Sequence, residues 1–199
     1  MVKGTAWLPW ALYVPMGAAG AVWAWTSRRA VWSSPQAAWF ASEPSLAWTL
    51  GLAAAGLTAW GTLWSTRILV RRTQWARRLH LALRAALTGI SMPHLATLAA
   101  LSALAEELFF RAALAPALGM VPAAILFGLA HVSPPGTRFA WTLWATLMGI
   151  VFHVLFLGSG HLAVPILAHA IINYENMQYI VNYDPTPLDM DRPQPHGRC

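Results

Sequence analysis

The sequence predicts an all-α protein, a polytopic membrane helix bundle of about six transmembrane or membrane-buried helices plus a basic amphipathic helix. Of its 199 residues, 57% are hydrophobic and only 10% are charged, whereas soluble domains average about 25% charged residues. Apolar runs of about 20 residues, the length that spans a bilayer, recur along the chain between short polar segments. The composition therefore excludes an ordinary soluble domain.

Two apolar runs, 7–26 and 45–65, form an amino-terminal part that we delimit as residues 1–66. The first run is long for a signal peptide, and no convincing small-residue cleavage site follows it before Arg28 and Arg29. We therefore expect a retained transmembrane helix, followed by a polar loop over 28–44.

Arginines dominate the next segment, 67–90, which predicts an amphipathic helix on the membrane surface. Its apolar residues recur at helical spacing: Trp75, Leu79, Ala82, Ala86 and Ile90. The chain has 13 Lys and Arg against 7 Asp and Glu, but their concentration in one loop is what the positive-inside rule predicts. This pattern favours the lipid bilayer over nucleic acid as the partner, with the loop and the amino terminus in the cytoplasm.

Four further apolar runs, at 93–118, 121–132, 139–158 and 161–182, complete a second part that we delimit as residues 67–182. The run 121–132 is too short to span a bilayer alone, so we expect it to be buried against other helices. The proline-rich segment 183–199 is predicted to be a disordered tail. Its single cysteine, Cys199, cannot form an internal disulfide.

Three charged residues lie within six positions of one apolar run: Glu106, Glu107 and Arg111. Each ionisable group at such a place costs about 2.5–3.5 kcal/mol on the insertion scale, so it is expected to be paired or functional. Glu107 and Arg111 are four residues apart and can form an ion pair on one helical face. Glu106 lies about 140° from Arg111 and must find its partner on another helix.

Polar side chains on two other apolar runs are candidates for that partner. His131 follows Phe127 by four residues, and Asn173 follows His169 by four, so that His169 and Asn173 share a helical face. Histidine is the usual proton-transfer group near neutral pH. Depth along the predicted helices allows Glu106, His131 and His169 to meet near the same level.

These motifs, in this order on successive hydrophobic helices, resemble the CAAX protease and bacteriocin-processing (CPBP) family of intramembrane endopeptidases. The family includes the type II CaaX prenyl endopeptidases, and the resemblance covers roughly 67–182. It implies that Glu106 activates the attacking water and that His131 helps to hold that water. It also implies that His169 and Asn173 stabilise the oxyanion or position the water. Glu107 and Arg111 resemble the family's supporting acid and base.

The residues agree with hydrolysis without a covalent intermediate, because no serine or cysteine accompanies these groups. One departure is Ala112, where the family often has glycine after the arginine. Zinc stays an alternative, with Glu106, His131 and His169 as its ligands, although a metal-free reaction is favoured. His153 and Glu175 are expected to be structural or interfacial.

The predicted function is therefore an intramembrane endopeptidase that acts on a membrane-anchored protein or peptide. The composition of the chain suits a bacterial inner membrane. The resemblance favours a carboxy-terminal sorting tail or another precursor as the substrate. Two alternatives remain open: a non-catalytic bacteriocin-immunity or export-helper protein, and an ion transporter. The lack of paired inverted repeats argues against the transporter.

Overall fold

The computed structural model describes residues 8–34 and 38–186, and in this part of the chain the fold is all-α. The prediction of a helical bundle is thereby confirmed. Most of the predicted tail, from residue 187 onward, lies outside the described residues. The elements in order are α1 (Leu8–Thr26), α2 (Pro44–Arg72), α3 (Gln74–Leu87), α4 (Met92–Glu107), η1 (Leu108–Leu114), α5 (Ala115–Leu118), α6 (Met120–Ala130), α7 (Arg138–Ser159) and α8 (Ala163–Asn182).

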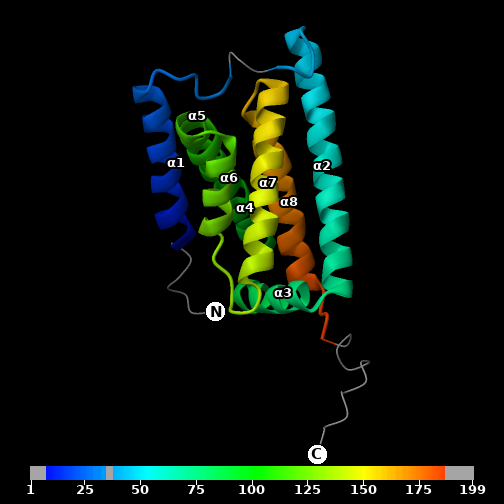
Figure 1. The fold of residues 1–199 in the computed structure, drawn as a ribbon. Coiled ribbons are helices and arrows are strands. Elements are labelled where there is room, and N and C mark those ends of the chain that lie inside the picture. The colour runs from blue at the N-terminus through cyan, green and yellow to red at the C-terminus, as the bar shows by residue number, and fades with distance from the viewer. Residues whose placement is uncertain (1–7, 35–37, 187–199) are drawn as a thin grey trace, which may run out of the picture.

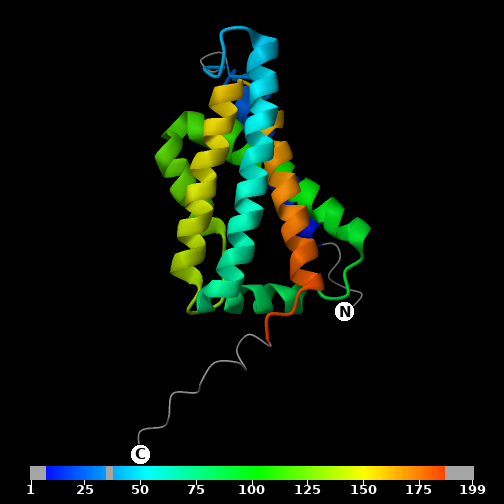
Figure 2. The same cartoon turned by 90° about the vertical axis from the view of Figure 1, so that its right-hand side faces the viewer.

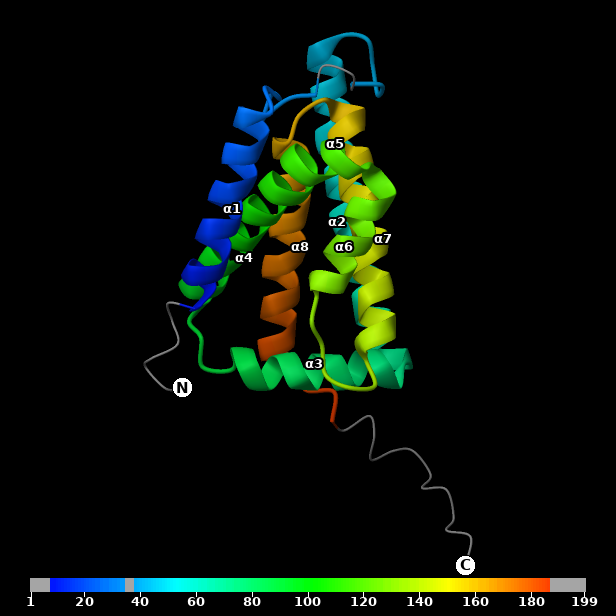
Figure 3. The same ribbon diagram turned by 60° about the vertical axis from the view of Figure 1, so that its left-hand side comes forward.

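The long helices stand side by side, and α3 crosses the bundle at one end (Figure 1). Helix α4 slants across the bundle and packs against both α1 and α8 (Figures 2 and 3). Helix α8 also packs against α2, α3 and α7. It therefore lies at the centre of the bundle, beside the α4 helix that carries Glu106 and Glu107.

Two helix boundaries differ from the sequence prediction. Helix α2 does not end near residue 65 but continues to Arg72, so the amphipathic helix α3 begins only at Gln74. The predicted run 93–118 is divided into α4, a π-helical segment η1 and the short α5. The short run 121–132 forms α6, which ends immediately before His131.

Length and composition alone identify two membrane-crossing helices within the described residues, α2 and α7. The apolar runs had predicted more, about six transmembrane or membrane-buried helices. Helices α4 and α6 have only 16 and 11 residues, and α8 carries several of the polar candidate residues. Much of the outer surface is nevertheless apolar: Trp60, Trp64 and Phe139 are exposed, for example, as expected of side chains that face lipid.

Glycines allow α1 to approach the helices behind it. Gly17 faces Ala105 of α4, and Gly20 faces the backbone of Phe109 in η1. Small residues let membrane helices pack backbone against backbone in this way. The amino-terminal helix is thus in direct contact with the segment that carries Glu106 and Arg111.

Candidate active site

The predicted site residues come from four elements that meet inside the bundle. Glu106 and Glu107 end α4, Arg111 lies in η1, and His131 follows the last residue of α6. His169 and Asn173 lie on α8. Because α4 packs along α8, residues 62 or more positions apart in sequence come together.

Glu107 is the centre of a buried ionic contact. Its Oε1 lies 3.0 Å from Arg111 Nη1 and 2.8 Å from His169 Nδ1. Glu107 and Arg111 are 0% and 2% exposed, which makes the pairing necessary, because an unpaired charge there would be very costly. Arg111 also donates from Nη2 to the carbonyl of Gly149 at 3.2 Å. This network holds the imidazole of His169 in one orientation.

Aromatic rings enclose the same network. The Arg111 guanidinium lies 4.4 Å from the ring centroid of Phe127 and 5.4 Å from that of Phe152. Phe152 in turn stacks on the His169 ring at 4.7 Å with an interplanar angle of 17°. These contacts exclude water from the Arg111 side of the site and strengthen its electrostatic interactions.

Glu106 faces the two histidines rather than Arg111. Its Oε2 lies 3.7 Å from His169 Nε2 and 4.0 Å from His131 Nε2. Both distances are too long for direct hydrogen bonds, and this buried oxygen has no hydrogen-bond partner in the described structure. Polar atoms at such separations are typically bridged by water.

His131 is oriented by its own helix. Its Nδ1 donates to the carbonyl oxygen of Phe127 at 2.7 Å, because a carbonyl can only accept. The neutral ring then presents the lone pair of Nε2 to Glu106. The open turn that follows α6 leaves the His131 side chain 24% exposed, more than the side chains of Glu106 and His169.

Asn173 contacts a serine, so the expectation that no serine accompanies these groups was wrong. Its Nδ2 donates to Ser102 Oγ at 3.1 Å, and Ser102 Oγ donates to the carbonyl of Ala99 at 3.2 Å. Ser102 precedes Glu106 by one helical turn on α4, which is the signal that could have identified it. Asn173 of α8 is therefore held against α4 by a serine that lies one turn before Glu106.

The π-helix begins directly after Glu107. Such segments are rare and are frequent at functional sites. Their altered hydrogen bonding leaves backbone carbonyls to be satisfied by other groups, and Arg29 donates from Nη1 to the carbonyl of Ala113 at 2.9 Å. A residue of the loop between α1 and α2 thus supports the segment that positions Arg111.

A cavity of about 120 Å³ reaches the site from the end of the bundle covered by α3. Elements α2, α3, α6, α7 and α8 contribute to its wall, which includes His131, His169 and Asn173. On α3 it is bordered by His80, whose pKa is lowered by burial and whose Nε2 donates to the carbonyl of Tyr183 at 2.9 Å. A substrate can therefore approach the two histidines through an internal path.

Residues 88–174 match a family model described as type II CAAX prenyl endopeptidase Rce1-like. This segment is therefore similar to the Rce1-like family. It contains all six predicted site residues, and the family resemblance drawn from their motifs is confirmed. No curated protein and no solved structure gave a match. The match supports an intramembrane CAAX protease kind of function, and α2 and α7 are long and apolar enough to cross a membrane.

A metal centre would need the carboxylate and the two histidines of this segment close together. A zinc ion with ligand bonds of about 2.0–2.2 Å holds tetrahedral ligand atoms about 3.3–3.6 Å apart, whereas Glu106 Oε2 lies 3.7 and 4.0 Å from the histidine nitrogens. No group of three or more His, Cys, Asp or Glu side chains within 8–34 and 38–186 is arranged to hold a metal ion. These side chains do not fit a metal as they stand.

Two other polar residues lie apart from this cluster. His153 is buried on α7 and lines a small void with Arg111 and Gly149. Glu175 is half-buried on α8, just beyond the end of the Rce1-like match. Neither residue lines the cavity that leads to His131 and His169.

Proposed function

We propose that the chain is an intramembrane endopeptidase in which Glu106 activates a water molecule for attack on a peptide bond. One observation carries this proposal. The buried Oε2 of Glu106 has no hydrogen-bond partner among the described residues, yet it faces Nε2 of both His131 and His169 at 4.0 and 3.7 Å. The similarity of this segment to the Rce1-like family supports the same activity.

A water between Glu106 and His131 would donate one hydrogen to each. Glu106 Oε2 accepts as a carboxylate, and His131 Nε2 accepts because Nδ1 carries the ring hydrogen that binds Phe127. Both hydrogens of the water are then engaged, so an oxygen lone pair is left for the carbonyl carbon. Such positioning accounts for a large part of the rate of intramolecular reactions.

The reaction needs donors for the oxyanion and a proton for the leaving amine. Glu106 takes a proton as the water oxygen bonds to the carbonyl carbon, and it delivers this proton to the amine nitrogen as the C–N bond breaks. Asn173 has a second amide hydrogen beyond the one bound to Ser102. In its protonated form, His169 would donate from both ring nitrogens, to Glu107 and to the oxyanion.

No step of this mechanism requires a metal. The separations of Glu106 from His131 and His169 suit an intervening water better than a shared ion. Glu107 and Arg111 act on the reaction through His169, whose ring they orient.

The substrate we propose is a membrane-anchored protein or peptide, with a bacterial carboxy-terminal sorting tail or precursor as the favoured type. The cavity that leads to the histidines is largely apolar and lies within the bundle. A bacterial inner membrane, with the arginine-rich α3 and the amino terminus on the cytoplasmic side, agrees with the positive-inside rule.

Expression of the chain and of Glu106→Gln in the same bacterial membrane tests this function. Mass spectrometry of peptide termini in membrane proteins should find new ends that form with the native chain and are lost with Glu106→Gln. The isosteric change keeps the shape but removes the base. The ends should still form when a chelator is present.

Glu175→Gln is the matched control, because it removes a half-buried carboxylate outside the cluster and should leave the new ends unchanged. Equal amounts of all three proteins in the membrane show that folding is preserved. Identical ends from Glu106→Gln and the native chain would contradict the proposal. So would the absence of any new end.

A further inference from the structure

The cavity beside the catalytic cluster is too small for the proposed substrate. Its volume is about 120 Å³, whereas pockets that enclose drug-sized ligands measure about 300–1,000 Å³. A peptide of several residues is at least as large as such a ligand. The structure is therefore a closed form of the protein, and an element of the cavity wall has to move before a peptide bond can reach Glu106.

Helix α3 lies across the end of the bundle, whereas the other elements of the wall run along it (Figure 3). A single extended residue, Thr73, joins α3 to α2, and residues 88–91 join it to α4. In the second connection, Gly89 has a φ of 86° and would have no atom within 4 Å of an added Cβ. A hinge needs only a few such residues at the ends of an element, so α3 can move while the long helices stay packed.

Two side chains hold α3 against the end of α8. Arg84 donates from Nη1 to the carbonyl oxygens of Ile180, Val181 and Tyr183, with distances of 2.9 Å to the first and 3.2 Å to the last. His80 donates from Nε2 to the same carbonyl of Tyr183 at 2.9 Å. Carbonyls at the end of a helix lack partners within it, and a cation there also interacts favourably with the helix dipole.

These contacts can be broken and remade without unfolding the bundle. All of them are hydrogen bonds to main-chain oxygens, and Arg84 is half-buried, so water can replace its bonds when α3 moves. Leu79 and Leu83 line the cavity from α3. The apolar face of an amphipathic helix can rest in the headgroup region of a membrane, so that opening transfers these side chains to lipid rather than to water.

We propose that α3 is a lid over the cavity and that Arg84, together with His80, is the latch that keeps the lid closed until a substrate enters. This inference rests on the proposed endopeptidase function. Because the latch holds most molecules in a form that admits no peptide, the apparent affinity for substrate is reduced by the fraction that is open. Weakening the latch should therefore increase cleavage although it makes the protein less stable.

The reactivity of a buried cysteine measures opening without turnover. In a Cys199→Ser background, which contains no cysteine, Leu79→Cys places a thiol on the α3 wall of the cavity, where the native side chain is 6% exposed. Such a group reacts through local opening. Arg84→Gln should raise its rate of reaction with N-ethylmaleimide in detergent about 10-fold or more, because hydrogen bonds from a charged donor are lost.

Two matched controls separate opening of the lid from general loosening. Arg72→Gln removes an exposed arginine at the end of α2 and should leave the rate at Leu79→Cys unchanged. Leu155→Cys makes the same substitution in the core of the bundle, where the native side chain is 3% exposed, and it should stay unreactive in Arg84→Gln. An equal rise at both cysteines, or no rise at Leu79→Cys, would contradict the lid.

Cleavage kinetics then separate the lid from the protease function. On a peptide that spans a Glu106-dependent cleavage site, Arg84→Gln should raise kcat/KM about 3- to 10-fold while the midpoint of thermal unfolding falls. A purely structural arginine would lower both. If Leu79→Cys becomes reactive in Arg84→Gln but kcat/KM does not rise, the inference is wrong while the protease function stands. If the native protein cleaves no such peptide, the proposed function fails, and the cysteine rates still decide whether α3 opens.

Discussion

Ser102 connects the two helices that carry the proposed catalytic groups. Its hydroxyl accepts from Asn173 Nδ2 and donates to the carbonyl of Ala99, one turn earlier on α4. Because its single hydrogen is engaged with Ala99, Ser102 can only accept from Asn173, which fixes the amide orientation. One amide hydrogen of Asn173 is thereby directed to α4 and the other is left for the reaction.

Ser102→Ala should therefore lower kcat more than it changes KM. The fall should be about 2- to 13-fold, since one hydrogen bond contributes about 0.5–1.5 kcal/mol. Steady-state kinetics on a cleaved peptide measure this split. Thr97→Val is the control, because it removes an exposed hydroxyl from the same helix. A change in KM alone would assign Ser102 to substrate binding instead.

The candidate residues could be found from the sequence, but their contacts could be found only in part. Helical spacing predicts that Glu107 and Arg111 pair, and they lie 3.0 Å apart. Spacing cannot show that His169 approaches the same carboxylate at 2.8 Å, because this contact depends on how α4 and α8 cross. From the sequence, Glu106 was expected to face the histidines and Glu107 to pair with Arg111. In the structure, His169 lies near both carboxylates, 3.7 Å from Glu106 Oε2 and 2.8 Å from Glu107 Oε1.

At the level of the elements, the π-helix η1 is the feature that the sequence did not predict. Residues 93–118 have the apolar composition of a single helix, and local propensity does not distinguish α from π hydrogen bonding. Contacts from elsewhere support η1, including Arg29 on the carbonyl of Ala113 and α1 along its side. The amphipathic helix was predicted from residue spacing over 67–90, but α3 covers only Gln74–Leu87, because α2 continues to Arg72.

The contact between α1 and η1 can be tested at Gly20. A Cβ at this position would lie 2.6 Å from Phe109 Cα, so Gly20→Ala must push the two helices apart. We expect a loss of about 1–3 kcal/mol, seen as a lower midpoint of thermal unfolding in detergent, together with reduced peptide cleavage because Arg111 lies in η1.

Gly56→Ala provides the comparison, since a Cβ there would have no atom within 4 Å. Alanine is favoured over glycine in a helix by about 0.5–1 kcal/mol, so this variant should be as stable as the native protein or slightly more stable. Equal unfolding midpoints for the two variants would show that α1 does not pack on η1 as described.

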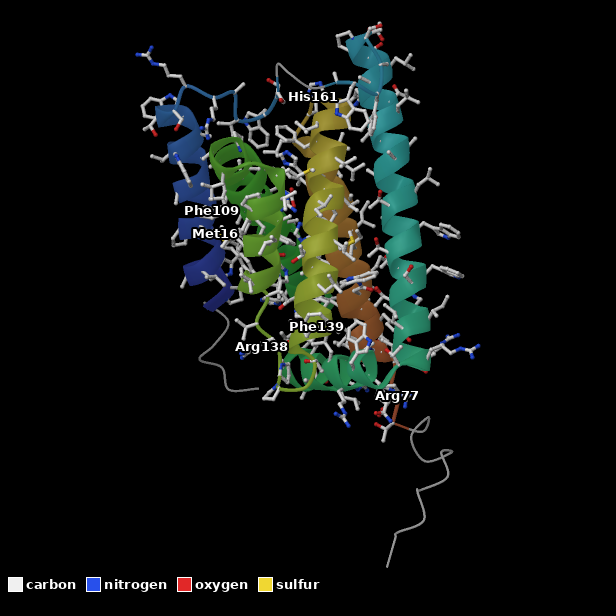
Figure 4. All side chains as sticks on the ribbon, in the orientation of Figure 1. Met16, Arg77, Phe109, Arg138, Phe139 and His161 are labelled. Atoms are coloured by element: carbon white, nitrogen blue, oxygen red, sulfur yellow. The ribbon has the colours of Figure 1, made fainter. Side chains whose placement is uncertain are left out.

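In the whole molecule, the two ends of the bundle differ in charge. Arg77 and Arg138 lie at the end that carries α3, and His161 lies at the opposite end (Figure 4). The start of α1 and the end of α8 are also at the α3 end (Figure 1). The loop between α1 and α2 lies at the other end, where Arg29 is engaged with Ala113. This relative arrangement agrees with the topology predicted from the apolar runs, because successive long helices run through the bundle in opposite directions.

The charge difference predicts which end faces the cytoplasm. In a Cys199→Ser background, single cysteines at the exposed positions Arg78 and Arg138 should react with a membrane-impermeant maleimide only in inside-out vesicles. Cysteines at the exposed positions Ser27 and Ser42 should react only in intact cells after removal of the outer membrane. The physical reason is that loops rich in arginine stay on the cytoplasmic side. Labelling of Arg78→Cys and Ser42→Cys from the same side would contradict the arrangement of the bundle. If all four positions reacted from the opposite side, the arrangement of the bundle would still hold. The cavity entrance beside α3 would then lie on the outer face, and substrates would have to arrive from outside the cell.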